Sequence, residues 1–120
     1  MYTTQKDFEL FKKEANKWID RLSLHDWEYS FEHKDLSKND ATCKSYFEGK
    51  IIVLSLGKTI NKENRTKREH IKYLAMHEVL HVLLENLYHQ AIDRGFCHGD
   101  YLAEEHCVIH RLQKAFKELK

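Results

Sequence analysis

The chain has 120 residues, of which 42% are hydrophobic and 32% are charged, and its formal net charge at pH 7 is +1. This size and composition predict one soluble globular domain over residues 1–120, large enough to bury about two-thirds of the surface of the unfolded chain. The near-zero net charge provides no basic excess, so nucleic acid is not expected as the main partner. The local basic run at 62–68 is interpreted as the solvated approach to a helix, with contact to an anionic surface as the alternative.

The sequence indicates neither a membrane span nor a disulfide framework. No stretch reaches the roughly 18 apolar residues of a membrane helix, and the N-terminus has no signal-peptide core, so a cytoplasmic location is expected. The cysteines Cys43, Cys97 and Cys107 are odd in number and widely separated, which argues against disulfides and against a cysteine-rich zinc site. We expect Cys107 to be a buried free thiol.

The first half of the chain predicts one helix followed by three strands. Apolar residues recur at helical spacing over 4–22, and Thr4 can cap this helix. Aromatic residues then alternate with polar ones over 27–34, which is typical of a strand. A second strand is expected over 42–47, and a turn at 48–50 leads into a third strand over 51–56. The near-continuous apolar run of the third strand indicates a central position in the sheet.

The second half predicts helices. After a polar loop, Thr66 and Glu69 fit a capping box that opens a helix continuing to about Leu87. Asp100 is expected to cap a last helix over 101–119. Helix, three strands, helix, helix is an order that predicts an α+β domain, in which a small three-stranded antiparallel sheet packs on helices.

The sequence His77-Glu78-Val79-Leu80-His81 carries the strongest chemical signal. Residues four apart lie on one face of a helix, about 6 Å apart along its axis, so His77 and His81 can share one zinc ion at roughly 2.0–2.1 Å each. Glu78 lies beside that ion and can accept a proton from a water molecule that the metal activates. The alternative is a pair of hydrogen-bonded core histidines, with Glu78 reaching solvent.

A third protein ligand is expected from the last helix. Glu85 lies about 12 Å along the helix axis from His77, too far to share its ion. Glu105 falls on the apolar stripe of the last helix, where a carboxylate needs a cation or hydrogen bonds, and Glu104 is the second choice. His106 and His110 form another pair four residues apart, which we interpret as a solvated flank rather than as the alternative, a second metal site. His106 could also form a hydrogen bond near the first site.

The motif at 77–81, followed by Glu105-His106-Cys107-Val108-Ile109-His110-Arg111-Leu112, resembles the compact zincin-like metallopeptidases that phages often encode. The resemblance covers the order of elements over 27–120, but only these two motifs match residue by residue. It implies a gluzincin-type site with Glu105 as the third ligand, a zincin-like fold whose edge strand lines the cleft, and the host cytoplasm as the location. The related metallopeptidases that cleave phage repressors have an Ala-rich segment around their ligand glutamate, and this chain lacks it.

The expected function is zinc-dependent hydrolysis of a peptide or protein substrate by a monomer. Zn²⁺ would be held by His77, His81 and Glu105, with Glu78 as the general base. A donor that stabilises the developing negative charge on the substrate oxygen is also needed, and the sequence does not rank the candidates. These candidates are Tyr88, His98, Tyr101 and His106. The alternative function is a non-catalytic metal-binding or protein-interaction module that keeps the zincin core.

Overall fold

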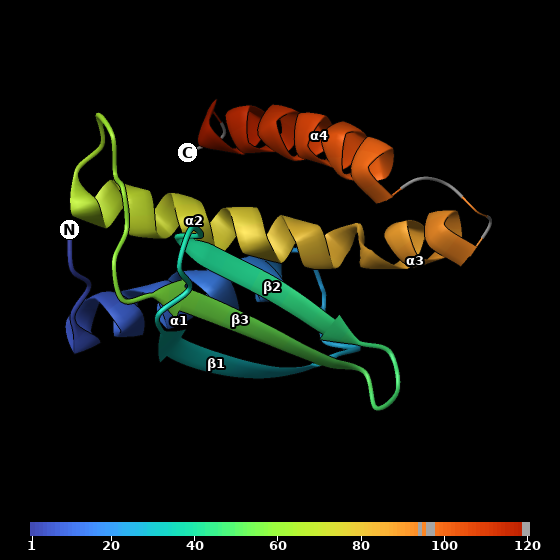
Figure 1. Ribbon diagram of the computed structural model, residues 1–120, viewed down its shortest axis with the longest axis horizontal. Coiled ribbons are helices and arrows are strands. Elements are labelled where there is room, and N and C mark those ends of the chain that lie inside the picture. Colours follow the sequence, from blue (N-terminus) through green and yellow to red (C-terminus); the bar gives the residue numbers. More distant parts are fainter. Residues whose placement is uncertain (94, 96–97, 119–120) are drawn as a thin grey trace.

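Helices and strands follow one another in the predicted order along the part of the chain that the computed structural model describes, which is residues 1–93, 95 and 98–118. Figure 1 shows the arrangement, an α+β fold with a small three-stranded sheet. The elements are α1 (Gln5–Arg21), β1 (Glu28–Lys34), β2 (Ala41–Tyr46), β3 (Ile51–Gly57), α2 (Lys67–Leu83), α3 (Glu85–Asp93) and α4 (His98–Glu118).

The capping residues predicted for the first two helices are confirmed. The Thr4 hydroxyl accepts a hydrogen bond from the backbone N–H of Asp7 at 3.2 Å, and the Asp7 carboxylate accepts one from the backbone N–H of Thr4 at 2.8 Å. At the start of α2, the Thr66 hydroxyl accepts a hydrogen bond from the backbone N–H of Glu69 at 3.1 Å. Both caps satisfy backbone donors that a helix N-terminus leaves unpaired.

The sheet is mixed, so the predicted antiparallel sheet is wrong for one of its two strand pairs. The strand order is β1-β3-β2, which confirms that β3 is central. β2 pairs with β3 antiparallel through a tight turn in which Gly49 has φ +84° and Lys50 has φ 54°. β1 pairs with β3 in parallel, with Glu28 opposite Ile51. The connection 35–40 carries the chain from β1 past the position of β3, and β3 then returns in the direction of β1.

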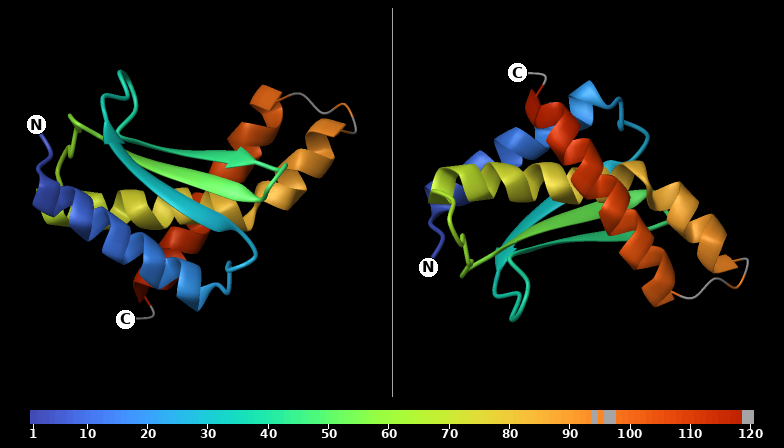
Figure 2. Two further views of the ribbon diagram at one scale, coloured as in Figure 1. Left: turned by 90° about the horizontal axis from the view of Figure 1, so that it is seen from below. Right: turned by 90° about the horizontal axis from the view of Figure 1, so that it is seen from above.

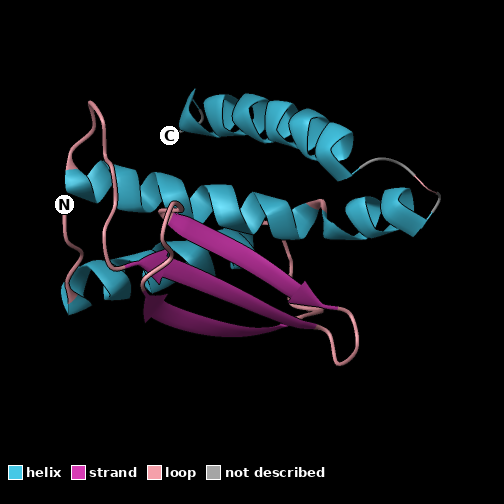
Figure 3. Cartoon of the chain, viewed as in Figure 1, coloured by secondary structure: helices cyan, strands magenta, loops and turns pink. Residues whose placement is uncertain are grey.

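The core lies between one face of the sheet and the helices α1 and α2. β3 contributes Ile52, Leu54 and Leu56, which have no exposed surface, and the helices contribute Phe11 and Ile71, buried to the same degree. Figure 3 shows the strands forming one layer, with the helices packed against it. Alternate residues of β3 point to the same face of the sheet, and α2 packs on that face. In this position α2 also contacts β2, so the 77–81 motif lies beside that strand.

Two helix boundaries differ from the predictions. α2 ends at Leu83 and α3 begins at Glu85, so Glu85 does not continue the motif helix as we expected. Leu84 is the C-cap of α2, with φ −97° and ψ 2°, and its backbone N–H bonds to the carbonyl groups of Leu80 and Val82. α4 already begins at His98, so the expected cap at Asp100 is wrong. Figure 2 shows that α4 then crosses over α2.

The buried face of α4 is rotated about the helix axis from the predicted apolar stripe. Val108 is 41% exposed although it belongs to that stripe, whereas Gln113 is only 6% exposed. The face against α2 includes the buried residues Glu105, Ile109 and Gln113. This rotation turns the flank that carries His106 towards α2.

The cysteines that the structure describes, Cys43 and Cys107, are both free. Cys107 is exposed, so its predicted burial is wrong, and the cause is the same rotation of α4. The predictions for Cys97 and Leu119 fall outside the described residues. In the described part of the chain, every helix is too short or too polar to cross a membrane.

Replacing Asp7 by alanine should lower the free energy of unfolding by about 1 kcal/mol at pH 7, because it removes half of the capping box and the contact of 2.8 Å with Lys67 of α2. Burial raises the pKa of Asp7, but hydrogen bonds from Lys67 and Thr4 outweigh it and leave the pKa below its usual value. This stabilisation is present above the unfolded pKa of about 3.9 and is lost as the pH falls through the folded pKa. Urea unfolding at pH 7 and pH 2.5 measures both.

Glu9→Ala is the matched control for Asp7→Ala. Glu9 lies on the same helix, more than half exposed, and its partner Lys12 is also partly exposed, so its loss should cost less than about 0.5 kcal/mol. A difference between Asp7→Ala and the parent that persists unchanged at pH 2.5 would contradict the electrostatic part of this account.

Candidate metal centre

Three imidazoles from two helices converge on one point. His77 and His81 come from α2, His106 comes from α4, and one ring nitrogen of each lies within 4.8 Å of the others. The ring centroids are 5.1 Å apart for His77 and His81, 5.5 Å for His77 and His106, and 5.0 Å for His81 and His106. The solvated flank predicted for His106 is therefore wrong. This group of nitrogen donors is compatible with binding a metal ion.

Each motif histidine has an oxygen partner behind it. The Nδ1 atom of His77 lies 3.3 Å from Oε1 of Gln113, and the Nδ1 atom of His81 lies 3.0 Å from Oε1 of Glu105. An imidazole that donates its Nδ1–H to such an oxygen keeps the lone pair of Nε2 free for a metal. The arrangement therefore fixes the tautomer and the ring orientation that a metal site needs.

The two motif histidines have opposite pKa shifts. Burial lowers the pKa of His77 to about 4, with a further contribution from the charge of His81, so His77 is neutral at pH 7. Burial also lowers the pKa of His81, but the hydrogen bond that its ring donates to Glu105 and the charge of Glu78 outweigh this effect, and the net shift is upward. His77 thus needs to lose no proton before it binds a metal at pH 7, whereas His81 holds its extra proton more strongly than usual and must release it before its free nitrogen can bind.

Glu78 is buried beside the histidines, with only 7% of its surface exposed. Burial raises its pKa to about 7, and the nearby His81 opposes that shift. The alternative reading of the motif placed Glu78 in solvent, and the structure contradicts this part of it. A carboxyl group with a pKa near neutrality can both take up and release a proton at physiological pH.

The acidic residues considered as third ligands occupy different places. Glu105 is 4% exposed and contacts His81, but it does not belong to the group of atoms within 4.8 Å of one another. Glu104 lies exposed on α4. Glu85 accepts a hydrogen bond from the Ser45 hydroxyl at 2.5 Å, and burial raises the pKa of its carboxyl group.

A cavity of about 470 Å³ contains the histidines and opens beside the sheet. One wall is the edge strand β2, through residues that include Thr42, Cys43 and Ser45, as the resemblance implied. α2, α3 and α4 form the other walls. Of the expected donors for a substrate oxygen, Tyr88, His98 and His106 line this cavity. Tyr88 is hydrogen-bonded to His98, and Tyr101 packs on Tyr88 with ring centroids 5.2 Å apart.

Sequence reasoning missed Gln113, and it considered His106 only as a hydrogen-bonding group near the site, not as a ligand of the same ion. Both lie on the face of α4 that also carries Glu105 and Ile109, at spacings of three, four and seven residues. Their helical spacing relative to Glu105, which we had already placed on the buried face, was the sequence feature that could have identified them. It was hidden by Val108 and Leu112, whose apolar side chains pointed to a different face.

Comparison with known proteins gives one similar structure. No protein-family model matches the sequence, and the search of curated proteins found no match. Among solved structures, the fold is similar to the crystal structure of the metallopeptidase zymogen jannalysin of Methanocaldococcus jannaschii, with 19% identity, a TM-score of 0.46, and coverage of 93% of this chain and 96% of that chain. At this TM-score the likeness is one of general shape, so the case for metal binding rests on the side chains of the site.

Proposed function

We propose that this chain is a zinc-dependent peptidase. The observation that carries the proposal is the convergence of imidazoles from α2 and α4 next to the buried carboxyl group of Glu78, in a cavity bordered by an edge strand. His77 and His81 would hold the ion, and α4 would provide the third ligand. Three protein ligands with one open position are the usual composition of a catalytic zinc site.

The donor set fits zinc better than calcium or magnesium. Imidazole nitrogens are borderline-soft ligands that suit zinc and other first-row transition metals, whereas calcium and magnesium prefer oxygen ligands. The contacts of Gln113 and Glu105 with the two motif histidines are the outer partners that zinc-binding histidines usually have. Zinc is therefore the metal that we assign.

Glu105 remains our proposed third ligand from the sequence, and His106 is the candidate that the distances support. To bind the ion, the Glu105 carboxylate would have to leave its contact of 3.0 Å with His81. If His106 binds instead, Glu105 stays as the partner that orients His81. The two assignments make different predictions for zinc affinity, given in the Discussion.

Glu78 is the proposed general base. Bound zinc would supply Lewis-acid polarisation of the substrate carbonyl and a lower pKa for water. The Glu78 carboxylate takes the proton of the attacking water and passes it to the amine that leaves when the peptide bond breaks. Its burial raises its pKa to about 7, so both steps are possible near neutral pH.

β2 is the proposed surface for the substrate backbone. It is an edge strand of the sheet and lines the cavity next to the histidines. An extended peptide can add to such an edge through main-chain hydrogen bonds, which hold its backbone without requiring a particular sequence. His106, Tyr88 and His98 are the donors available in the cavity for the oxygen of the scissile carbonyl.

Peptide cleavage should depend on zinc. We expect the zinc-loaded protein to cleave a mixed-sequence peptide library, a zinc chelator to remove at least about 99% of the activity, and added Zn²⁺ to restore it, because no other group in the proposed mechanism lowers the pKa of the attacking water. Mass spectrometry of the products measures this. Zinc bound at one equivalent without cleavage of any peptide would contradict the peptidase proposal and support a non-catalytic metal-binding module.

A further inference from the structure

The proposed peptidase mechanism does not use a series of hydrogen-bonded side chains at the N-terminal end of α2, which links Asp40, His70 and Arg65. His70 is only 5% exposed, and its Nε2–H donates a hydrogen bond to the carboxylate of Asp40 at 2.8 Å. Asp40 also accepts a hydrogen bond from the backbone N–H of Asn61 at 3.2 Å. Because Nε2 is the donor, the Nδ1 atom of His70 is left as an acceptor.

That acceptor holds the guanidinium group of Arg65. A terminal N–H of Arg65 donates to Nδ1 of His70 at 3.1 Å, and the central carbon of the guanidinium lies 3.8 Å from the centre of the Tyr73 ring. The group is thus held by a hydrogen bond in its plane and by an aromatic ring on its face. A guanidinium has five N–H donors, so this hydrogen bond leaves four for other partners.

No carboxylate of the described residues forms an ion pair with Arg65. Asp40 is linked to Arg65 only through His70, and its carboxylate oxygens already accept hydrogen bonds from His70 and Asn61. Arg65 is therefore a partly buried, oriented cation without an internal counter-ion. Holding a guanidinium in one orientation lowers the entropy lost when it binds an anion.

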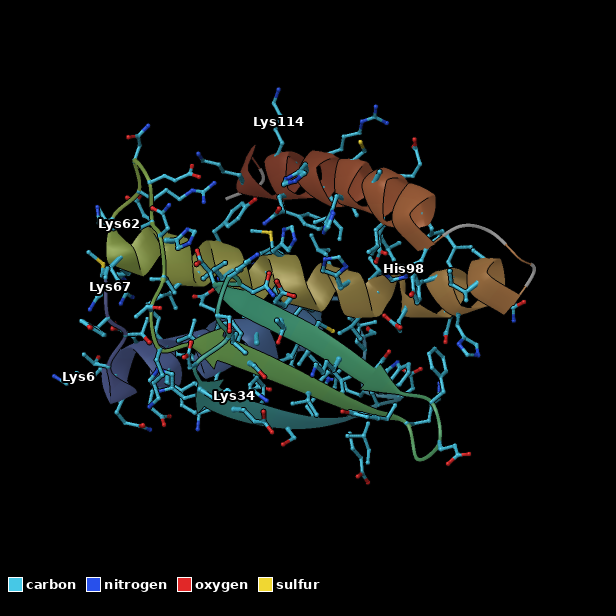
Figure 4. The ribbon with its side chains drawn as sticks, in the orientation of Figure 1. Lys6, Lys34, Lys62, Lys67, His98 and Lys114 are labelled. Atoms are coloured by element: carbon cyan, nitrogen blue, oxygen red, sulfur yellow. The ribbon has the colours of Figure 1, made fainter. Side chains whose placement is uncertain are left out.

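Arg65 lines a second cavity, of about 460 Å³, that meets the metal centre. Its walls include Asn39, Arg65, His70 and Tyr73, and also His77 and Glu78, which line the first cavity too. Figure 4 shows Lys62 and Lys67 at this end of α2 and His98 near the opposite end. The two cavities thus lie one after the other along α2 and meet at His77 and Glu78.

We propose that Arg65 binds a carboxylate of the peptide substrate and so determines specificity; this rests on the proposed peptidase function. A guanidinium binds a carboxylate through two parallel N–H···O bonds, and these are stronger where solvent is partly excluded. The cavity is also lined by the exposed side chains of Lys38 and Glu63, of opposite charge, and by Asp40, whose carboxylate is hydrogen-bonded to His70 and Asn61. Arg65 is the cation that ring and hydrogen-bond contacts orient there. The carboxylate belongs to an acidic side chain or to the C-terminus of a peptide.

The test is a cleavage profile of the zinc-loaded protein and three variants. The substrate is a mixed-sequence peptide library, used once with free C-termini and once with amidated C-termini, and mass spectrometry locates each cleaved bond. The variants are Arg65→Gln, Arg65→Lys and, as a matched control, Arg68→Gln. Arg68 is an exposed residue of the same basic run and does not line the cavity. Thermal unfolding of each variant shows whether it is folded.

The parent should prefer, by roughly tenfold or more, bonds at one fixed distance from a carboxylate. Arg65→Gln should lose this preference while it still cleaves neutral peptides, Arg65→Lys should retain part of it, and Arg68→Gln should match the parent.

A preference that disappears in the amidated library identifies the C-terminal carboxylate, and one that persists identifies Asp or Glu side chains. Cleavage without such a preference, or with the same preference in Arg65→Gln, overturns this inference alone. Zinc binding without any cleavage overturns the peptidase proposal and this inference with it.

Discussion

Glu78→Gln should lower kcat for peptide cleavage by about a hundredfold to ten-thousandfold while the protein still binds zinc. General-base catalysis contributes about 10²–10⁴-fold, and glutamine can neither take up the proton of the attacking water nor deliver it to the leaving amine. Glu78 is not among the atoms that converge on the proposed ion, so its replacement leaves the donor set complete. The measurements are kcat with a peptide identified from the library and zinc content by elemental analysis.

Glu104→Gln is the control for this variant. It makes the same chemical change on an exposed position of α4, and cleavage should remain within about twofold of the parent. A Glu78→Gln protein that cleaves as fast as the parent would show that Glu78 is not the base. Loss of zinc together with activity in Glu78→Gln would instead show that Glu78 binds the ion.

His77→Ala and His81→Ala should each weaken zinc binding by more than about a hundredfold. Removing an outer partner of a zinc ligand typically costs 10–100-fold in affinity, and removing the ligand itself costs more. Competition with a chromophoric chelator at pH 7.5 gives the dissociation constants. His25→Ala is the control, since the His25 side chain is 65% exposed and pairs only with the exposed Asp20 among the contacts that the structure describes. An unchanged zinc affinity in either motif variant would contradict the site.

The same titration identifies the third ligand. If Glu105 binds the ion, Glu105→Ala should lose more affinity than His106→Ala. If His106 binds it, His106→Ala should lose more than about a hundredfold, and Glu105→Ala should lose the 10–100-fold that is typical of an outer partner. Equal and small losses in both variants would exclude α4 as the source of a ligand.

The sequence predicted those features of the fold that depend on the order of polar and apolar residues within a single helix or strand. The alternation of Tyr29 and Phe31 with polar residues defined β1, and the apolar run of β3 indicated its central place. The direction of β1 relative to β3 was not predictable in the same way. Alternation looks the same for parallel and antiparallel pairing, and the direction follows from where the connection 35–40 takes the chain.

The sequence predicted the proximity of those candidate residues that lie on one helix. The spacing of His77 and His81 alone places both rings on one face of α2, and the structure brings them together. The contribution of α4 depends on how this helix is rotated against α2, which its own apolar residues did not determine. Val108 is largely exposed and Gln113 is buried, so tertiary packing turned His106 towards the motif. Glu85 was misplaced because its helical pattern continues through the break at Leu84.

Anomalous X-ray scattering at the zinc absorption edge, from crystals of the zinc-loaded protein, tests the central claim most directly. We expect one strong peak between α2 and α4, within about 2.0–2.2 Å of a ring nitrogen of both His77 and His81 and of one donor atom from Glu105 or His106. Absence of a peak at this place, or a peak bound to other residues while the two motif histidines hydrogen-bond only to protein, would contradict the metal centre and the function built on it.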